Sequence, residues 1–548
     1  MTLSPDALHF VPLGGCGEIG MNLNLYGCRG KWLMVDLGVT FGDERTPGAD
    51  LIMADPRFIE ERSRDLLGIV LTHAHEDHLG AVAHLWPRLR APLYATPFTA
   101  AVLRAKLREV GLADEVPLRE IPLSGSFDLG PFGLRYLTVT HSIPEPNALA
   151  LTTPFGTVLH TGDWKLDPEP LVGARVDRSA FKALGDDGVL ALVCDSTNVF
   201  APGTSGSEAA VRASLAQLVA GCAGRVFVTL FASNIARLES VVEAARSNRR
   251  AVAMLGRSLA RYMEAAQAAG YLRDLEPFLP EEEAQRLPAE CVLYALTGCQ
   301  GEPNAALSRI VDGGHPFLRF GPGDTVIFSS KIIPGNERAI GRVHNALVRQ
   351  GARVLSERDH FVHVSGHPNR DELAEMYRWI RPRIAVPVHG ETRHLAEHGE
   401  LAASLQVPDV KVIENGEVLR LAPGPAAVVD RVPTGRLLLD GTALVEGESP
   451  LFKTRRRMLY HGVVLLTLVL DDRGRLLATP RLSAPGLGNG GADLEQAMGA
   501  VEDALEALTR AERVDDKAVH EAARLALRRH YAARTGKRPL IEVQVVRA

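Results

Sequence analysis

Several features that mark special classes of protein are scarce or missing in this sequence. Its 548 residues include only six cysteines, none in a CxxC pair, which excludes a disulfide scaffold and favours free thiols in a reducing compartment. The most apolar run, residues 463–470, is far shorter than the ~20 residues that span a bilayer. No basic segment followed by an apolar one opens the chain, so we expect no secretion signal. These absences predict a cytoplasmic protein without a membrane span.

The chain also lacks an excess of positive charge. Lysine and arginine number 61, aspartate and glutamate number 66, and the formal net charge is −5. This balance argues against a protein that coats nucleic acid by bulk attraction, although a local basic channel needs only a few well-placed cations. Hydrophobic residues make up 46% of the chain and charged residues 23%, as in ordinary globular proteins. At roughly 150 residues per domain, the length predicts about three or four domains.

The pattern of apolar residues changes along the chain. Residues 8–200 read as short strands separated by turns, which predicts stacked sheets. From Ser207 onward, strands alternate with helical segments, the pattern of a parallel α/β unit. A charged cluster at residues 453–457 resembles a linker, and residues 459–548 combine strands with two helical stretches. The chain therefore divides into parts that differ in secondary structure.

The most informative string is HAHEDH at residues 73–78, directly after an apolar strand. Five side chains of ligand type in six positions would be costly to bury without a cation. Alternation along an extended segment puts His73 and His75 on the same side. Asp77 and His78 then follow a turn, where they suit a second ion. The alternative is a solvated, histidine-rich loop.

Further candidate ligands follow other predicted strands. His141, Asp163 and His389 each stand just past the end of an apolar segment. Taken singly, each has an ordinary structural explanation. One rim of a sandwich could gather all three beside the HAHEDH string, and a site for two ions needs such additional ligands.

These motifs resemble those of a known family. HxHxDH, followed by a His and an Asp at later strand ends, is similar to the metallo-β-lactamase superfamily. Other segments resemble its bacterial β-CASP branch, the ribonuclease J family, over the whole chain and most closely over residues 10–421. They are PLGGCGEIG at 12–20, VDLG at 35–38, CDSTN at 194–198, TGCQGEP at 297–303, IPGNE at 333–337 and HVSGH at 363–367.

The resemblance implies an α/β protein. It would consist of an αββα metallo-β-lactamase sandwich, an inserted α/β β-CASP domain and a small α+β C-terminal domain. The expected boundaries are 1–205 and 368–448 for the sandwich, 206–367 for the β-CASP domain, 449–458 for a linker and 459–548 for the C-terminal domain.

The resemblance also implies two divalent ions, Zn²⁺ or Mn²⁺, because imidazole and carboxylate ligands suit both. Three histidines would hold one ion, two histidines and an aspartate would hold the other, and a second aspartate would bridge them. In that order, the expected ligands are His73, His75 and His141; His78, His389 and Asp77; and Asp163. Asp36, in the VDLG motif, is expected to orient a ligand histidine rather than to bind an ion.

The same resemblance implies hydrolysis of a phosphodiester. Two ions can activate a water and neutralise charge on a phosphoryl group, so Asp77 and His78 count among the catalytic residues. His367 matches the β-CASP histidine motif and is the candidate general acid for the leaving 3′ oxygen; the alternative is that it only binds phosphate. Asp195 matches the β-CASP acidic motif and is expected to orient His367 or groups of the metal site.

Two segments match the family's phosphate-binding segments. Their hydroxyl and backbone N–H groups would hold a 5′-phosphate. The segments are Ala232, Ser233 and Asn234, and His363, Val364, Ser365, Gly366 and His367. Without the resemblance, Ser233 and Asn234 read as an ordinary helix N-cap. The chain departs from the family at Ala236, where relatives often carry His.

A structural cation is a further expectation. Gly48, Asp50 and Asp440 match positions at which some relatives hold a divalent cation, and hard oxygen ligands suit Ca²⁺ or Mn²⁺. Ordinary turn residues are the alternative.

The function implied is that of a metal-dependent ribonuclease. It would degrade single-stranded RNA 5′→3′ from a 5′-monophosphate and also cut internally, in rRNA processing and mRNA decay. A homodimer or homotetramer, with contacts to RNA-decay proteins, is expected from the resemblance. The alternatives are a related β-CASP nuclease that acts on DNA or on RNA 3′ ends, and a catalytically silent RNA-binding scaffold.

Overall fold

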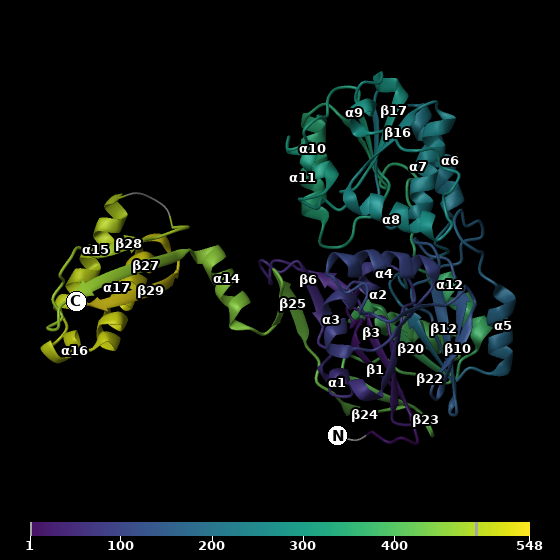
Figure 1. Cartoon of the computed structure of the whole chain (residues 1–548), viewed down its shortest axis with the longest axis horizontal. Coiled ribbons are helices and arrows are strands. Elements are labelled where there is room, and N and C mark those ends of the chain that lie inside the picture. The colour runs from purple at the N-terminus through teal and green to yellow at the C-terminus, as the bar shows by residue number, and fades with distance from the viewer. Residues whose placement is uncertain (1–2, 488–490) are drawn as a thin grey trace. The chain divides into compact units, whose positions relative to one another are not determined.

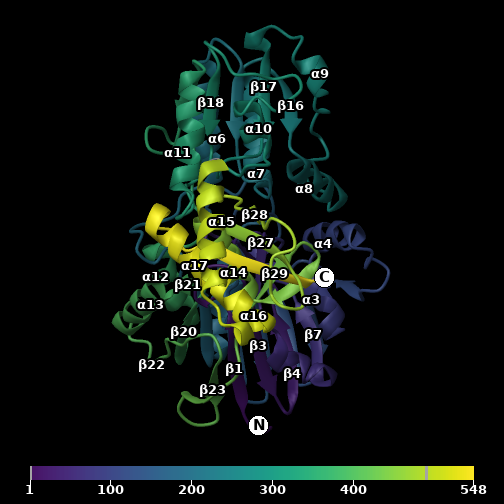
Figure 2. The ribbon, with the colours of Figure 1, turned by 90° about the vertical axis from the view of Figure 1, so that its left-hand side faces the viewer.

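The computed structural model describes residues 3–487 and 491–548, which form two compact units. The first unit comprises residues 1–40 and 53–435, and the second comprises residues 41–52 and 436–548. Figure 1 labels the elements along the chain, and Figure 2 shows the same ribbon turned by 90°. Among the helices of the described residues, none is long and apolar enough to cross a membrane.

Two sheets pack face to face in the first unit. The eight strands of one follow the order β24(Ala427–Arg431), β23(Glu417–Ala422), β1(Leu8–Gly14), β3(Leu23–Cys28), β4(Lys31–Val35), β7(Leu66–Val70), β8(Leu93–Ala95) and β9(Leu118–Glu120). The seven strands of the other follow the order β10(Ser126–Leu129), β11(Phe132–Thr138), β12(Asn147–Thr153), β13(Gly156–His160), β14(Ala191–Asp195), β20(Ile384–Val388) and β22(Asp409–Val410). Side chains from both sheets, such as Phe10 and Tyr136, share one buried core.

Helices cover the outer faces of this sandwich. On the second sheet, α5(Arg178–Asp187), α12(Arg370–Ile380) and α13(Thr392–Ser404) bury an apolar cluster with strand residues. The helices that accompany the first sheet are α1(Arg57–Glu60), α2(Glu76–Leu79), α3(Val82–Leu89) and α4(Pro97–Glu109) (Figure 1). The chain thus has the four-layered αββα arrangement that the sequence predicts.

A separate parallel sheet is inserted between β14 and α12. Its strand order is β16(Ala251–Leu255), β17(Val292–Leu296), β15(Val226–Thr229), β18(Thr325–Phe328) and β19(Arg353–Leu355). Alternate strand residues face opposite sides, so each face buries its own cluster. One face packs against α6(Glu208–Ala220), α7(Ile235–Ser247) and α8(Arg257–Ala268); the other packs against α9(Glu281–Ala284), α10(Ala306–Val311) and α11(Glu337–Arg349). The predicted fold class is confirmed.

The carboxylate of Glu372 holds both chain crossovers of this insertion. It is buried, and it accepts hydrogen bonds from the backbone N–H groups of Ser205 (2.7 Å) on the outgoing chain and Asn369 (2.9 Å) on the returning chain. A third N–H, from Leu166 (2.8 Å), comes from the segment that follows Asp163. Asn369 and Glu372 also form the capping box that starts α12. One side chain therefore fixes the base of the inserted domain.

The second unit contains a small α+β core. Its elements are the hairpin β25(Arg436–Asp440) and β26(Ala443–Glu446), then α14(Pro450–His461), β27(Val463–Leu470), β28(Arg481–Ser483), α15(Gly491–Glu506), α16(Arg510–Val514), α17(Asp516–Thr535) and β29(Leu540–Arg547). The strands β5(Val39–Phe41) and β6(Leu51–Ala54) lie where the sequence passes between units. The expected linker at residues 449–458 falls on α14 and is therefore helical; the domain boundaries themselves stay predictions.

Candidate metal centre and substrate cleft

The candidate ligands all lie past the carboxyl ends of strands in the sandwich. His73 and His75 follow β7, and Asp77 and His78 lie on the short helix α2. His141, Asp163 and His389 follow β11, β13 and β20, respectively. The structure thus brings together, at one rim, side chains that are more than 300 residues apart in the chain.

Backbone geometry at this rim is unusual for the residue types present. Asp36 and His389 have φ angles of 64° and 53°, in the left-handed region that non-glycine residues seldom adopt. Such strain persists where surrounding contacts enforce it, commonly at functional sites. Gly38 meets a close approach, because a Cβ there would lie 1.7 Å from the carbonyl oxygen of Asp77. The backbone of the VDLG motif therefore packs directly against the backbone of the HAHEDH segment.

The first cluster consists of His73, His75, His141 and Asp163, whose ligand atoms all lie within 4.8 Å of one another. The Nδ1 atom of His75 is 3.0 Å from the Nε2 atom of His73 and 3.0 Å from that of His141. Burial lowers the pKa values of His73 and His141, and it lowers that of His75 to about 4. The three rings are therefore neutral and can present nitrogen lone pairs to a cation.

The second cluster consists of Asp77, His78, Asp163 and His389. The Asp163 carboxylate lies 3.2 Å from the Nε2 atom of His78 and 3.5 Å from that of His389. Asp163 belongs to both clusters, as a bridging carboxylate would. This arrangement brings together all seven ligands expected from the sequence.

The donor set fits divalent cations. Within the described residues, Nε2 of His389 is buried and has no hydrogen-bond partner, and Oδ1 of the buried Asp163 has only the ring nitrogen of His78 close to it. Buried polar atoms rarely stay unpaired without an ion or water. Imidazoles and carboxylates, with no thiolate among them, suit Zn²⁺ or Mn²⁺.

Asp36 contacts the second cluster at the His78 ring, through the nitrogen Nδ1. Its carboxylate lies 2.7 Å from Nδ1 of His78 and accepts hydrogen bonds from the N–H and the hydroxyl of Thr72, both at 2.8 Å. Asn22, which the sequence reasoning missed, places its side-chain oxygen 3.1 Å from Nδ1 of His389. The glycine-rich segment directly before Asn22 was the only available signal.

A third cluster joins the inserted domain to the rim. Nδ1 of His367 lies 2.8 Å from Asp195 and 3.8 Å from Asp163. Burial alone would lower the pKa of His367, but the Asp195 and Asp163 carboxylates outweigh it and raise that pKa to about 9. The neighbouring carbonyl of Gly366 contacts Nδ1 of His141 at 2.5 Å. The two carboxylates beside His367 therefore favour the protonated form of its ring.

The segment 232–234 makes contacts other than those expected. The hydroxyl of Ser233 lies 3.1 Å from Nε2 of His75, so Ser233 contacts a candidate ligand. Asn234 is buried and caps α7, accepting a hydrogen bond from the N–H of Arg237 (2.9 Å). Asn234 is thus the N-cap of α7, which is the role expected without the family resemblance. Ala232 is half-buried.

The segment 363–367 lies against the sandwich. The hydroxyl of Ser365 accepts hydrogen bonds from the side-chain amide of Asn198 (2.7 Å) and from the N–H of His367 (3.2 Å). Val364 is buried, and Nδ1 of His363 is buried without a hydrogen-bond partner among the described residues. This segment combines hydroxyl and imidazole groups close to the metal centre.

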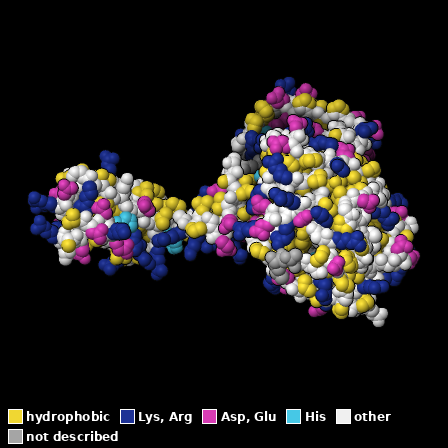
Figure 3. Space-filling model, turned by 60° about the horizontal axis from the view of Figure 1, so that its bottom comes forward, with side chains coloured by type: hydrophobic (Ala, Val, Ile, Leu, Met, Phe, Trp, Pro, Cys, Tyr) yellow, Lys and Arg dark blue, Asp and Glu magenta, His cyan; other side chains and the backbone are white. Residues whose placement is uncertain are grey.

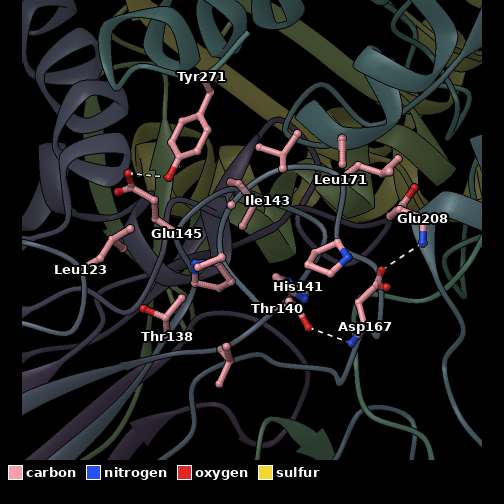
Figure 4. A pocket seen from close by; sticks show the side chains of 17 residues that line it. Leu123, Thr138, Thr140, His141, Ile143, Glu145, Asp167, Leu171, Glu208 and Tyr271 are labelled. Carbon is pink, nitrogen blue, oxygen red and sulfur yellow. Dashed lines mark hydrogen bonds between the residues drawn. The ribbon is translucent and has the colours of Figure 1, made fainter. Parts of the chain in front are cut away.

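The inserted domain also contacts the HAHEDH segment through α8. The Tyr262 hydroxyl donates a hydrogen bond to the carbonyl of Ala74 (3.2 Å), between the two histidines. His141 is in the lining of a small pocket (Figure 4). The volume of this pocket is about 20 Å³, roughly the space of one water. At one side of this pocket, the Tyr271 hydroxyl donates a hydrogen bond to the Glu145 carboxylate (3.0 Å). Ala236, the position that departs from the family, is in its lining.

The expected structural-cation residues have a different partner. Both carboxylate oxygens of Asp440 bind the Arg455 guanidinium, at 2.7 and 2.9 Å. A Cβ on Gly48 would lie 3.0 Å from the same guanidinium. Asp50, two residues further on, is exposed. The guanidinium thus neutralises the carboxylate for which a divalent cation was expected, and the cation stays a prediction.

Charged side chains of both signs are interspersed on the face of the molecule that Figure 3 shows. This mixture agrees with the net charge of −5 and with the expectation that nucleic acid is not bound by bulk attraction. Any contact with a polyanion must therefore come from particular cations near the site.

Four family models match parts of the chain. They describe the metallo-beta-lactamase superfamily (residues 25–220), the ribonuclease J beta-CASP domain (223–347), a Zn-dependent metallo-hydrolase RNA specificity domain (351–411) and the ribonuclease J C-terminal domain (451–548). Together they cover most of the chain, in the order that the sequence predicts.

Curated relatives match over nearly the full length. Ribonuclease J from Sinorhizobium meliloti is 44% identical over 99% of this chain and 98% of its own. Ribonuclease J from Mycobacterium tuberculosis is 37% identical over the same shares of the two chains. A crystal structure from Enterococcus faecalis, described as a protein of unknown function, matches 76% of this chain and 100% of its own, with a TM-score of 0.52 and 15% identity. That likeness shows the fold alone.

Proposed function

The chain belongs to the ribonuclease J family, and from this premise we propose that it hydrolyses RNA phosphodiester bonds with two bound divalent ions. The observation that carries the proposal is the pair of buried clusters that share Asp163. A catalytically silent scaffold would not need seven ligand groups gathered in two clusters that share a carboxylate. The combination of fold, donor set and relatives favours an active nuclease.

The first ion would be held by His73, His75 and His141, and the second by Asp77, His78 and His389. Asp163 would contact both. When bound, the ions would supply an activated water as nucleophile and would neutralise charge that develops on the phosphoryl group. Zn²⁺ and Mn²⁺ both suit these donors, and metal analysis of the purified protein separates them.

The chain's own residues would position and protonate the substrate. His367, charged because of Asp195, would donate its proton to the leaving 3′ oxygen. Asp36 would hold the His78 ring in place through its bond to Nδ1. The segment 363–367 would hold a 5′-phosphate, with Ser365 as the hydroxyl donor. A 5′ end held there favours 5′→3′ removal of nucleotides from 5′-monophosphate RNA, and a strand that passes the segment would be cut internally.

Replacing both Asp77 and His78 by alanine tests the metal centre. We expect loss of RNA hydrolysis and of one bound ion, with the far-ultraviolet circular dichroism spectrum retained. Full activity in this variant would refute the two-ion proposal. Comparing 5′-monophosphate RNA, 5′-triphosphate RNA, 5′-hydroxyl RNA and DNA on the unaltered protein then tests the polymer and the 5′ preference.

The role of His367 needs a different probe. A substrate with sulfur in place of the leaving 3′ oxygen needs no protonation, because a thiolate is a good leaving group. His367→Ala should slow cleavage of the oxygen substrate but leave the sulfur substrate nearly unchanged. Equal losses on both substrates would make His367 a phosphate-binding residue only. Self-association and protein partners stay predictions.

A further inference from the structure

A cavity of about 930 Å³ is lined by the inserted domain and by Glu109, at the end of α4 of the sandwich, and none of its lining residues is assigned above. It opens at the carboxyl ends of β16 and β17, where Leu255 and Thr297 are in its lining. Arg257 and Arg261 of α8 and Arg309 of α10 contribute cationic side chains. In open parallel sheets, ligands commonly bind in crevices at this edge.

Gly256 is in the lining of the cavity, between the end of β16 and the start of α8. Gly256 has a φ of +125°, and a Cβ there would lie 2.6 Å from the Thr297 hydroxyl. A side chain at this position would therefore clash with Thr297, and the glycine lets the chain turn tightly into α8. The cavity stays open between the beginnings of α8 and α10.

The charges that line the cavity are not equally satisfied. Glu109 pairs with Arg261 at 2.5 Å, Glu281 lies 3.1 Å from His315, and Glu302 accepts the N–H of Gln300 at 2.9 Å. The side chains of Arg257 and Arg309, by contrast, are exposed, and their guanidinium groups make no hydrogen bond or ion pair with any described residue, although the charge of Arg309 acts on the nearby Glu281 carboxylate. Glu109 and Glu302 are thus engaged, whereas Oε1 of Glu281 is buried without a hydrogen-bond partner among the described residues, and the guanidinium groups of Arg257 and Arg309 are available for a ligand.

The strand order relates this cavity to the metal centre. The chain after β15, the central strand, contacts His75 through Ser233. β16 lies two strands away on one side, about 10 Å at the usual spacing, and β19, which leads to the segment 363–367, lies two strands away on the other. The sheet edge therefore runs from the cavity, past the candidate metal centre, to the proposed 5′-phosphate segment.

Helix α8 connects the cavity to the centre directly. Arg257 begins this helix, and Tyr262, little more than one turn later, bonds to the carbonyl of Ala74. The same helix packs against α4 of the sandwich (Figure 1). A strand leaving the centre on this side would pass along α8 toward the cavity.

We propose that this cavity is a second RNA subsite, which holds backbone phosphates on the 3′ side of the cleaved bond through Arg257 and Arg309. Guanidinium groups bind phosphate oxygens in pairs, and their planar fork suits a polyanion more than a neutral ligand. The proposal rests on the proposed function, since it takes the substrate strand to run from the 5′-phosphate segment through the metal centre.

The test is a double variant, Arg257→Ala with Arg309→Ala, assayed on 5′-monophosphate RNAs of increasing length. For RNAs long enough to reach the cavity, we expect KM to rise about tenfold or more with little change in kcat, as two charged hydrogen-bonded contacts are lost. A di- or trinucleotide should show the unaltered KM. The slope of log KM against log salt should fall by about 1.4, since each phosphate contact contributes about 0.7 on a single strand.

The matched control replaces Arg246 and Arg249 by alanine. Both are exposed, and they precede β16. They therefore lie near the amino end of this strand, whereas the cavity opens at its carboxyl end. This control should leave KM unchanged at every length. Equal KM values for the double variant and the unaltered protein on long RNA would overturn the subsite, as would an equal loss on short and long RNA. Trinucleotide cleavage by the unaltered protein reports on the proposed function independently, because it does not involve the cavity.

Discussion

The pair formed by Asp195 and His367 allows the proton chemistry of the site to be tested quantitatively. The two side chains lie 2.8 Å apart, and Asp195 is fully buried. Two unit charges ~4 Å apart at an effective dielectric constant of ~20 interact by about 4 kcal/mol. That energy corresponds to about 3 pKa units. Asp195→Asn keeps the size and an acceptor oxygen but removes the charge that favours protonated His367, so we expect its pKa of about 9 to fall by about 2 to 3 units.

The assay is the pH dependence of kcat/KM for a 5′-monophosphate RNA, with both proteins fully loaded with the same metal. The protonated form of His367 is the active one, so activity is lost as pH rises through its pKa. Bound cations act on both proteins alike, and the difference between their profiles isolates Asp195. In Asp195→Asn, the alkaline limb should move to lower pH by about 2 units, equivalent to a loss of about tenfold or more at pH 8.

A substrate with a sulfur leaving group provides the control. With that substrate, the alkaline limb due to His367 should disappear in both proteins, because the leaving group needs no proton. An alkaline limb at the same pH in both proteins on the oxygen substrate would refute the reasoning. His367 would then either not donate the proton or not depend on Asp195 for its charge.

Three further changes have defined outcomes. Glu372→Ala should lower the free energy of unfolding by about 3 to 5 kcal/mol in denaturant titrations, because the N–H groups of Leu166, Ser205 and Asn369 lose their acceptor. A loss below about 1 kcal/mol would contradict the role of Glu372 at the base of the inserted domain. Asp36→Ala should weaken metal binding about 10- to 100-fold in a chelator competition, since His78 loses its orienting carboxylate; unchanged affinity would count against that role. Arg455→Ala should strengthen Ca²⁺ binding at Asp440 in calorimetry, because the carboxylate loses the guanidinium that neutralises it; unchanged Ca²⁺ affinity would count against this competition.

The sequence predicted most of the fold and the residues that gather at the rim. The HAHEDH string was informative because its residues are neighbours in the chain, so strand alternation alone relates His73 to His75. His141, Asp163 and His389 could be recognised as strand-end residues, but their convergence depends on how two sheets pack. That packing was supplied by the family resemblance and not by local pattern.

Contacts between distant side chains were beyond sequence reasoning. Asn22 supports His389 from 367 residues away, and Tyr262 reaches Ala74 from 188 residues away. The glycine-rich segment before Asn22 marks a special turn but not its partner, and nothing in the sequence marks the contact of Tyr262. The contact of the Ser233 hydroxyl with His75 depends on where the inserted domain docks and could not be predicted, while phosphate binding by Ser233 stays a prediction.

Three contacts from the inserted domain converge on the first histidine cluster. Ser233 lies against His75, the Tyr262 hydroxyl binds the carbonyl between His73 and His75, and the carbonyl of Gly366 contacts His141. Each contact fixes a ring or the backbone that carries it. The ring orientations that the first ion would require are therefore set partly by the insertion, and not by the sandwich alone. A domain that covers the rim and also orients its ligands makes metal geometry and substrate access depend on the same interface, so a change at that interface should affect both together.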